Sequence, residues 1–416
     1  MKLGKYSMGI GDRFAKQGKA QLAALLRAEQ QGLLITPVWN KSFREHQIVH
    51  SEPQQTREAA DTAVNEMQWK HPYFVDADHI NLSNVDKFIE YCDFFTLDVA
   101  DYIDKKDTQE NIRNFVSRNS ELVGNLIIPG ISKTFMISED ILTRVAGKYL
   151  LAAREAGKLY RHIESHKGKG NFITEVSMDE VSTPQSPLEF YFILKELAAE
   201  GIPVDTIAPK FSGRFNKGVE YAGDLRIFES EFEEYLCILQ HARENFKLPT
   251  ELKLSIHSGS DKFSLYPIMG ELIRKYNQGI HLKTAGTTWL EELIGLGLSG
   301  FKALVVAKNI YIRALSRFDE LCGPYSTVID ISVSKLPKPE DVIQWSAEKF
   351  VNTLRHIPEN PDYNSNFRQL MHVSYKIAAE HSDVYLNLLE QNKDLVGKQV
   401  TENLFDRHIK RLFNLK

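Results

Sequence analysis

Acidic side chains stand at the end of an apolar-rich run in the middle of the chain. Residues 171–180 alternate apolar and polar side chains and end in two adjacent carboxylates, Asp179 and Glu180. The run follows a flexible Lys-Gly-Lys-Gly segment (167–170) and precedes a turn with Pro184 and an amphipathic helix. A strand that ends in acids just before a helix is typical of a β/α barrel, which carries its catalytic groups at the carboxyl ends of its strands.

The same arrangement recurs along the chain, so several ionisable groups are expected at one face. Other apolar runs lead to Asp78, His79, Lys210 and His257, and Asp224 lies in the loop that follows Lys210. Two imidazoles and several carboxylates can form a mixed nitrogen and oxygen site for a divalent metal such as Mn²⁺, Ni²⁺, Co²⁺ or Zn²⁺. No spacing here is diagnostic in the way that HExxH is, so the prediction depends on repeated placement at one barrel face.

Each of these residues also has a purely structural interpretation. Asp179 or Glu180 could cap the next helix, and His79 could cap a helix that begins near Ser83. His257 could be a satisfied core histidine, and His281, early in its strand, is expected to be structural. A solvated charge is the structural interpretation of any lysine, but the apolar run before Lys210 would bring its ammonium to the barrel mouth.

Eight strand–helix alternations favour a (β/α)₈ TIM-like barrel over a doubly wound sheet. We expect strands over 6–14, 33–39, 73–80, 94–99, 171–180, 204–211, 252–257 and 279–284. We expect helices over 17–30, 54–68, 84–91, 188–199, 229–245, 264–277 and from Trp289.

The remaining segments are expected to be additions to the barrel. Residues 105–166 exceed a barrel connection and predict a helical insertion after the fourth strand. After residue 290 the pattern is mostly helical, with one strand-like run at Thr327–Val333. We therefore expect a single domain over 1–416, with the barrel at about 6–320 and a helical C-terminal extension at about 321–416.

Composition excludes several classes of protein. With 416 residues, 43% hydrophobic, the chain can bury a large core, and its net charge of −4 argues against a nucleic-acid partner. There is no run of 18 apolar residues and no apolar signal-peptide core after Met1, which predicts a cytoplasmic protein without a membrane partner. Cys92, Cys237 and Cys322 lack CxxC spacing and are expected to be free thiols. A homo-oligomer remains possible, although no interface can be predicted.

Five motifs together resemble the tagaturonate epimerase family: 8–14 (Met-Gly-Ile-Gly-Asp-Arg-Phe), the 179–180 acids, 208–224, 255–262 and 281–286. The resemblance spans roughly 6–290, and 208–224 (Ala-Pro-Lys-Phe-Ser-Gly-Arg-Phe-Asn-Lys-Gly-Val-Glu-Tyr-Ala-Gly-Asp) and 255–262 (Ser-Ile-His-Ser-Gly-Ser-Asp-Lys) are its most distinctive parts. It implies an isomerase that uses a divalent metal to interconvert D-tagaturonate and D-fructuronate at C4 in hexuronate catabolism. It also implies metal ligation by Glu180, Asp224 and His257, with His79 as a fourth ligand.

The chemistry of this epimerisation predicts further roles. The C4 hydrogen is not α to the C2 ketone, but the C4 hydroxyl is β to it, so deprotonation of this hydroxyl allows retro-aldol cleavage of the C3–C4 bond. A metal would act as a Lewis acid on the enediolate. The base at the C4 oxygen is expected among Asp179, Lys210 and Asp78. The residues expected to bind the substrate are Asp12, Arg13, Lys41, Arg44, Arg214, Lys262 and Lys283.

Three alternatives remain open at this point. Transient oxidation at C4 by bound NAD is less favoured, because Gly9 and Gly11 lack the third glycine of a dinucleotide fingerprint. A metal-dependent barrel aldolase or aldose–ketose isomerase acting on another sugar acid would have a similar site. A non-catalytic sugar-binding barrel would need neither metal nor the clustered acids.

Overall fold

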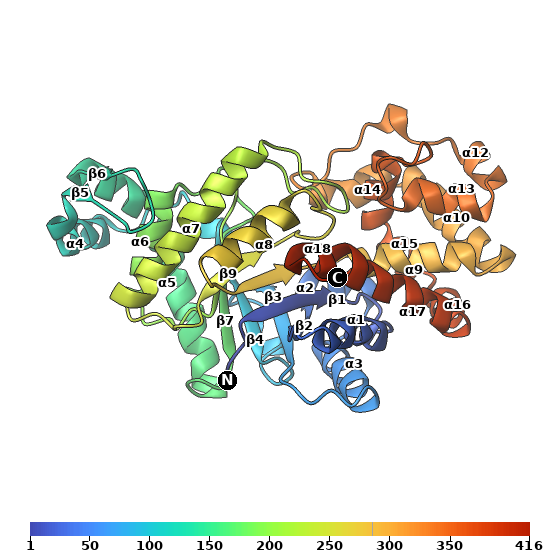
Figure 1. Cartoon of the computed structure of the whole chain (residues 1–416), viewed down its shortest axis with the longest axis horizontal. Coiled ribbons are helices and arrows are strands. Elements are labelled where there is room, and N and C mark those ends of the chain that lie inside the picture. The colour runs from blue at the N-terminus through green and yellow to red at the C-terminus, as the bar shows by residue number, and fades with distance from the viewer. Residues whose placement is uncertain (285) are drawn as a thin grey trace.

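Eight parallel strands form a closed barrel at the centre of the molecule (Figure 1). The computed structural model describes residues 1–416 except residue 285. In chain order the barrel strands are β1 (Tyr6–Gly11), β2 (Thr36–Ser42), β3 (Phe74–Ile80), β4 (Phe94–Asp98), β7 (Ile173–Ser177), β8 (Thr206–Ala208), β9 (Lys253–Ile256) and β10 (Ile280–Lys283). Each strand overlaps one predicted from the sequence, so the (β/α)₈ fold is confirmed.

Strand register brings the polar strand ends to one rim. Ser42 of β2 pairs with Asp78 of β3, and Asp98 of β4 pairs with Ser177 of β7. On the other side of the barrel, β10 closes against β1 with Lys283 beside Gly9. Because all the strands are parallel, their carboxyl ends surround a single mouth, where a β/α barrel places its site.

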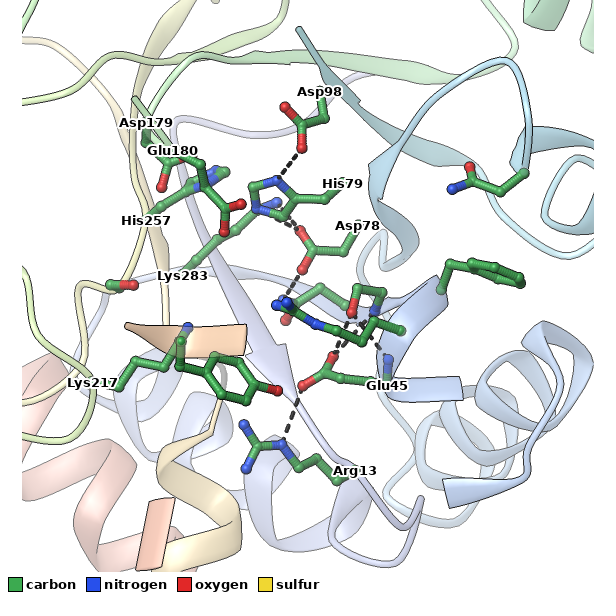
Figure 2. Close-up of a pocket in the computed structure, with 17 residues that line it drawn as sticks. Arg13, Glu45, Asp78, His79, Asp98, Asp179, Glu180, Lys217, His257 and Lys283 are labelled. Carbon is green, nitrogen blue, oxygen red and sulfur yellow. Dashed lines mark hydrogen bonds and ion pairs between the residues drawn. The ribbon is translucent and has the colours of Figure 1, made fainter. Parts of the chain in front are cut away.

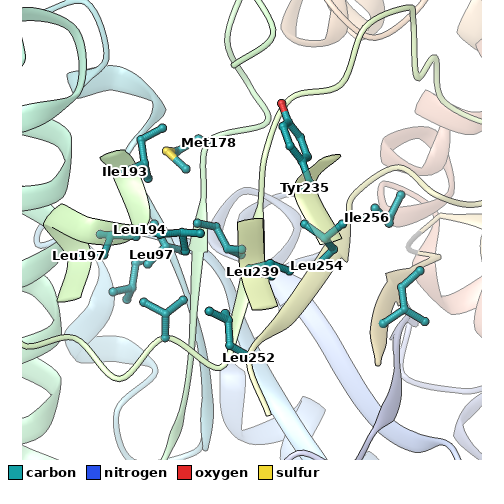
Figure 3. Close-up of a cluster of buried hydrophobic side chains, with 14 of the residues drawn as sticks. Leu97, Met178, Ile193, Leu194, Leu197, Tyr235, Leu239, Leu252, Leu254 and Ile256 are labelled. Atoms are coloured by element: carbon teal, nitrogen blue, oxygen red, sulfur yellow. The ribbon is translucent and has the colours of Figure 1, made fainter. Parts of the chain in front are cut away.

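Helices surround the barrel and bury its outer face: α1 (Gly18–Gln30), α3 (Pro53–Glu66), α5 (Glu139–Lys167), α6 (Pro187–Ala199), α7 (Leu225–Asn245) and α8 (Leu265–Lys275). Figure 3 shows Leu194 of α6, Leu239 of α7 and Leu254 of β9 among the buried apolar side chains between the helices and the barrel. The helix predicted over 84–91 is wrong, because only a 3₁₀ turn, η1 (Val85–Lys87), forms there. A second short helix, α2 (Phe43–Val49), follows β2 directly and begins with a Ser42–Glu45 capping box.

The insertion is not wholly helical. It contains α4 (Gln109–Arg118), the turn η3 (Ser120–Leu122) and an antiparallel hairpin of β5 (Gly124–Leu126) and β6 (Phe135–Ile137). These elements lie at one end of the molecule, on the opposite side from the C-terminal helices (Figure 1). The helix α5, which the sequence assigned to the insertion, covers the barrel, because Leu142, Ala153 and Ile163 belong to the barrel core.

We call residues 287–402 the C-terminal layer. It consists of α9 (Thr287–Leu298), α10 (Phe301–Ser316), α11 (Phe318–Cys322), η4 (Gly323–Tyr325), η5 (Val333–Lys335), α12 (Pro339–Gln344), α13 (Ala347–Leu354), α14 (Ser365–Val373), α15 (Tyr375–Ala379), α16 (Ser382–Gln391) and α17 (Lys393–Glu402). A second hydrophobic cluster, which starts with Trp289 in α9, holds this layer together. The strand predicted at Thr327–Val333 is wrong, because this segment has no strand pairing and buries Ile329 in that cluster.

The chain finally returns to the barrel. The π-helical segment η6 (Asn403–Ile409) and α18 (Lys410–Phe413) place Leu404, Phe405 and Leu412 in the barrel core. None of the described helices is long and apolar enough to cross a membrane. The three cysteines are buried and free, as predicted.

Candidate active site

A polar pocket of about 280 Å³ opens at the carboxyl ends of the barrel strands (Figure 2). One side is rich in carboxylates and imidazoles, and the other carries cations from the segment after β1, from α2 and from the loop after β8. We call the first the acid–imidazole cluster: His79, Asp98, Asp179, Glu180 and His257. This volume is at the lower end of the range for small-molecule sites.

Two overlapping groups within the cluster have the composition of a metal site. Ligand atoms of His79, Asp179 and His257 all lie within 4.8 Å of one another, and so do those of His79, Asp98 and Glu180. The Nδ1 of His79 lies 3.3 Å from Asp98, and the Nδ1 of His257 lies 3.2 Å from Asp179. His79 therefore belongs to both groups.

Backbone irregularities aim these side chains into the pocket. The β3–β4 register shifts between Ala77 and Ile80, and His79 adopts a left-handed φ of 53°. Ser258, directly after His257, also has a positive φ of 48°. Bulges and strained residues of this kind are frequent at functional sites, where they redirect a side chain.

A buried carboxylate fixes the orientation of His257. Glu175 of β7 is fully buried, and its Oε1 lies 2.7 Å from the Nε2 of His257. The Nδ1 of His257 is therefore left to face the cluster, and no well-aligned hydrogen-bond partner meets it among the described residues. A carboxylate behind a histidine is the usual arrangement that orients an imidazole toward a metal.

Lys283 joins the acids beneath the pocket. Its buried Nζ lies 2.9 Å from Asp76, 2.7 Å from Asp78 and 2.8 Å from Glu175, and it donates to Thr96 Oγ1 at 2.7 Å. Burial alone would lower the pKa of Lys283, but the three carboxylates raise that pKa well above its usual value. Lys283 is therefore a fixed cation at the base of the site.

Negative potential dominates the cluster. Burial alone would lower the pKa of His257, but Asp179 and Glu175 outweigh it and raise that pKa to about 9. Burial likewise opposes the rise in the pKa of His79, which Asp78 and Asp98 hold well above its usual value. Burial would raise the pKa of Asp179, yet the neighbouring His257 and His79 keep it far below its usual value. The potential that favours imidazolium here would also favour a divalent cation.

Cations and aromatic rings form the opposite side of the pocket. Arg13 pairs with Glu45 at 3.1 Å and lies over Tyr375, with its Cζ 3.9 Å from the ring centroid. Arg44 and Lys217 also line the pocket.

Comparison with known proteins identifies the family. A family model described as tagaturonate epimerase matches residues 1–412. The chain belongs to the tagaturonate epimerase family. It is accordingly an epimerase, an isomerase, as its motifs predicted. A curated relative in this family, the tagaturonate/fructuronate epimerase of Thermotoga maritima, is 28% identical over 425 residues, which cover 98% of this chain and 80% of that protein.

Solved structures agree with the fold. A fructuronate-tagaturonate epimerase from Cohnella laeviribosi superimposes with a TM-score of 0.83 in a two-glycerol complex, covering 100% of this chain and 83% of that chain. Its native form gives a TM-score of 0.80, with 82% of that chain covered. Both are 21% identical to this chain, so the likeness shows a shared fold.

Many of the residues predicted for this family's site meet in the pocket. The pocket is lined by Arg13, Arg44, Asp78, His79, Asp179, Glu180, His257 and Lys283. Lys210 lines a smaller adjoining pocket of about 30 Å³, which shares Asp179, Glu180 and His257 with the first.

Asp224 is the implied metal ligand that the fold does not bring to the cluster. Its exposed carboxylate caps α7 by accepting a hydrogen bond from the backbone N–H of Arg226 at 2.8 Å. The cluster contains Asp98, at the end of β4, in its place. Asp98 also ends an apolar run in the sequence, so the strand-end pattern could have identified it.

Two predicted substrate-binding cations lie outside the pocket, because each donates hydrogen bonds to backbone carbonyls instead. Lys262 is buried and donates to the carbonyls of Asn216 and Val219 at 2.8 and 2.7 Å. Lys41 donates to the carbonyl of Arg13 at 2.7 Å.

Arg214 and Asp12 also lie elsewhere. Arg214 extends toward Asp330, 3.3 Å away, and is exposed. Asp12 is buried and accepts a hydrogen bond from the backbone N–H of Gln17 at 2.5 Å, just before α1.

The site also has features that the sequence did not predict. Two buried acids, Glu175 and Asp76, lie inside strands beneath the pocket, and the sequence did not predict their ion pairs. Lys217 lines the pocket from the loop that also carries the predicted Arg214, and Tyr325 lines it from the C-terminal layer. Only the folded chain brings that layer to the barrel mouth.

Proposed function

We propose that this chain interconverts D-tagaturonate and D-fructuronate at C4, in hexuronate catabolism, with a divalent metal. The observation that carries the proposal is the family match over residues 1–412 together with a pocket whose acid–imidazole cluster has the donors of a metal site. The relative from Thermotoga maritima bears the name of the same activity.

The cluster fits a divalent cation on its own chemistry. His79, Asp179 and His257 are the proposed ligands, and Glu180 and Asp98 lie close enough to complete the set. Mixed imidazole and carboxylate donors suit Mn²⁺, Co²⁺, Ni²⁺ or Zn²⁺. A bound cation would supply Lewis acidity at the substrate oxygens and make the C4 hydroxyl more acidic. Asp179, a candidate base from its sequence position, is thus assigned to the ligands.

Asp78 is the proposed base at the C4 oxygen. It lines the pocket, lies outside both ligand groups, and has one oxygen held 2.7 Å from Lys283. Burial would raise its pKa, but Lys283 and the histidines hold that pKa below its usual value, so Asp78 is ionised. As a weak base, it relies on the acidity that a bound cation would give the C4 hydroxyl. Lys210, at the adjoining pocket, is the second candidate for this role.

The reaction then follows the retro-aldol route in both directions. Asp78 takes the proton of the C4 hydroxyl, C4 becomes an aldehyde, and the C3–C4 electron pair passes to C3 and the C2 carbonyl to form an enediolate. Lys283, the cation at the base of the site, is the protein group that stabilises the negative charge on the three-carbon fragment. The aldehyde turns its other face, C3 attacks it, and Asp78 returns its proton to the new C4 oxygen.

Gly9 in β1 has a structural explanation that does not need NAD. A Cβ at Gly9 would come within 2.7 Å of Lys283 Cγ, so this glycine makes room for the buried lysine. Gly9 therefore supports the site from below.

Metal-restored turnover tests the proposal. Protein stripped with EDTA should convert D-tagaturonate to D-fructuronate only after addition of Mn²⁺, Co²⁺, Ni²⁺ or Zn²⁺, and His257→Ala should abolish the restored activity. Asp224→Ala is the matched control, because Asp224 is an acid of the same motif set that lies outside the cluster, and it should retain activity. Equal loss in both variants, or no conversion with any of the four metals in folded protein, would contradict the proposal.

A further inference from the structure

Two cations in the pocket have no carboxylate partner of their own. Among the described residues, no Asp or Glu oxygen lies within 4.0 Å of the charged nitrogens of Arg44 or Lys217, although both line the pocket. The other two cations of the lining are compensated, Arg13 by Glu45 and Lys283 by three acids. Arg44 and Lys217 are thus the charges left for an anionic ligand.

Both cations contact the same aromatic ring. The Cζ of Arg44 lies 4.7 Å from the ring centroid of Tyr325, and the Nζ of Lys217 lies 5.6 Å from the same centroid. The ring is fixed from behind, because the hydroxyl of Tyr325 lies 2.9 Å from that of Tyr375. Cation–π contacts of this kind hold both charges in place without neutralising them.

The loop that carries Lys217 is held by buried cations. The backbone N–H of Lys217 donates to the carbonyl of Val328 at 2.8 Å, which joins the loop to the C-terminal layer. Arg368 donates to the carbonyl of Gly218. Lys262 donates to the carbonyls of Asn216 and Val219, which flank Lys217 and Gly218. The position of Lys217 is therefore fixed before any ligand binds.

The far side of the pocket carries the acids Asp78, Asp98, Asp179 and Glu180, and the proposed function assigns that side to the metal and the reacting oxygens. A substrate carboxylate placed next to these acids would meet like charge. A ketouronate has one carboxylate at C6 and its reacting oxygens at C2 to C4. The charges of the pocket accordingly favour one direction of binding (Figure 2).

We propose that Arg44, Lys217 and Tyr325 form the subsite that binds the C6 carboxylate and selects ketouronates over neutral ketoses. This inference rests on the proposed function and adds the residues that set its substrate class. Lys217 and Arg44 meet the carboxylate, and Tyr325 is a positioning residue that holds both cations. The C-terminal layer thereby completes a site whose other groups come from the barrel.

Kinetics of charge-neutral variants test the subsite. Lys217→Gln and Arg44→Gln should each raise KM for D-tagaturonate about 10- to 100-fold, as expected for loss of a hydrogen bond to a charged group, with kcat changed far less. Lys217→Arg should restore most of the affinity. Tyr325→Leu should raise KM more than Tyr325→Phe does, because the Phe variant loses only the hydroxyl that fixes the ring and the Leu variant loses the ring itself.

A neutral ligand and a matched cation provide the controls. Binding of D-tagatose, measured by calorimetry beside that of D-tagaturonate, should be the same in wild type, Lys217→Gln and Arg44→Gln. Arg214→Gln, on the same loop but facing Asp330, should leave both ligands unaffected. Unchanged D-tagaturonate binding in Lys217→Gln and Arg44→Gln, or an equal loss for D-tagatose, would overturn the subsite.

The two proposals can fail separately. Suppose that wild-type protein binds D-tagaturonate without converting it, and that Lys217→Gln and Arg44→Gln bind it more weakly. This result would overturn the proposed function and leave the carboxylate subsite supported. Wild-type protein that converts it with the same KM in every variant would overturn the subsite alone.

Discussion

At the residue scale, the site depends on which acid stands behind which histidine. Glu175 is completely buried, yet it lies between Lys283 at 2.8 Å and His257 at 2.7 Å. A buried carboxylate is stable only when such partners compensate it. Burial would raise the pKa of Glu175, but Lys283 and His257 hold it well below its usual value.

Removal of the charge on Glu175 should weaken the metal site without touching its ligands. Glu175→Gln leaves the shape of the side chain but no longer fixes the tautomer of His257, so metal affinity should fall about 10- to 100-fold. Competition with a chelator of known affinity measures this loss, and Asp224→Asn is the control that should bind metal as wild type does. Equal affinity in Glu175→Gln and wild type would show that Glu175 only balances charge.

At the element scale, close approach of β1 and β10 makes room for Lys283. A Cβ at Gly9 would lie 2.7 Å from Lys283 Cγ and 3.3 Å from His281 Nε2. His281 was expected to be structural, and it is fully buried, with its Nδ1 2.8 Å from the hydroxyl of Ser7. The inner surface of these two strands is therefore packed around the base of the site.

Gly9→Ala should disturb both stability and catalysis. The added methyl group must displace Lys283, and overpacking of this kind costs about 1–3 kcal/mol. Urea unfolding measures the stability, and turnover of D-tagaturonate should fall together with it. Gly147→Ala in α5 is the matched control, since nothing lies within 4 Å of its added Cβ, and it should be neutral or stabilising.

The buried acid Glu292 in α9 predicts a pH-dependent stability. Burial, with Asp12 nearby, raises its pKa to about 8, and Tyr385 donates to it at 2.8 Å. The pKa of Glu292 in the folded protein lies above the value of about 4.3 in the unfolded chain. The contribution of Glu292 to the free energy of unfolding is therefore full below about pH 4.3 and is lost as the pH rises toward 8. Glu292→Gln should therefore gain stability relative to wild type between pH 5 and pH 8, by roughly 1–3 kcal/mol.

Thermal unfolding at the two pH values measures this difference. Any packing cost of the amide is the same at both, so the change between them reports the titration alone. Glu271→Gln, at an exposed position of α8, should track wild type throughout. A constant gap between Glu292→Gln and wild type would mean that Glu292 does not titrate in this range.

At the scale of the whole molecule, a buried ion pair joins the barrel to the C-terminal layer. Asp261, in the loop after β9, accepts from Arg368 of α14 at 3.0 Å, and both side chains are fully buried. His356, after α13, lies 3.3 Å from the same carboxylate. We infer that the chain is one domain rather than a barrel with a separable extension.

A single unfolding transition should follow from this. The four tryptophans divide evenly, with Trp39 and Trp69 in the barrel core and Trp289 and Trp345 in the layer. A variant that keeps only the barrel tryptophans and a variant that keeps only the layer tryptophans should unfold at the same urea concentration. Asp261→Asn should lower the free energy of unfolding in each of these variants by about 3–5 kcal/mol, because it leaves Arg368 as a buried unpaired charge. Two separate transitions would show that the layer is its own domain.

The sequence predicted the barrel because apolar runs of strand length alternate with helices eight times, a local signal. It also predicted the site residues that end strands, such as Asp78, His79, Asp179 and His257. It did not predict that Glu175, which lies within a strand, orients His257. It also missed Tyr325, whose approach to the barrel depends on tertiary packing. It assigned Lys262 to substrate because a charge beside a strand end looks the same whether it meets a ligand or a backbone carbonyl.

Conversion of D-tagaturonate followed by NMR in D₂O is the most direct test of the account. Metal-loaded wild type should produce D-fructuronate with protium retained at C4, because the retro-aldol route never breaks that C–H bond, and Asp78→Asn should slow the conversion by at least about 100-fold, as for the loss of a general base. A three-carbon fragment should also be trapped during turnover, because transient oxidation would retain the C4 hydrogen without cleaving the C3–C4 bond. Absence of conversion, or deuterium at C4, would contradict the account.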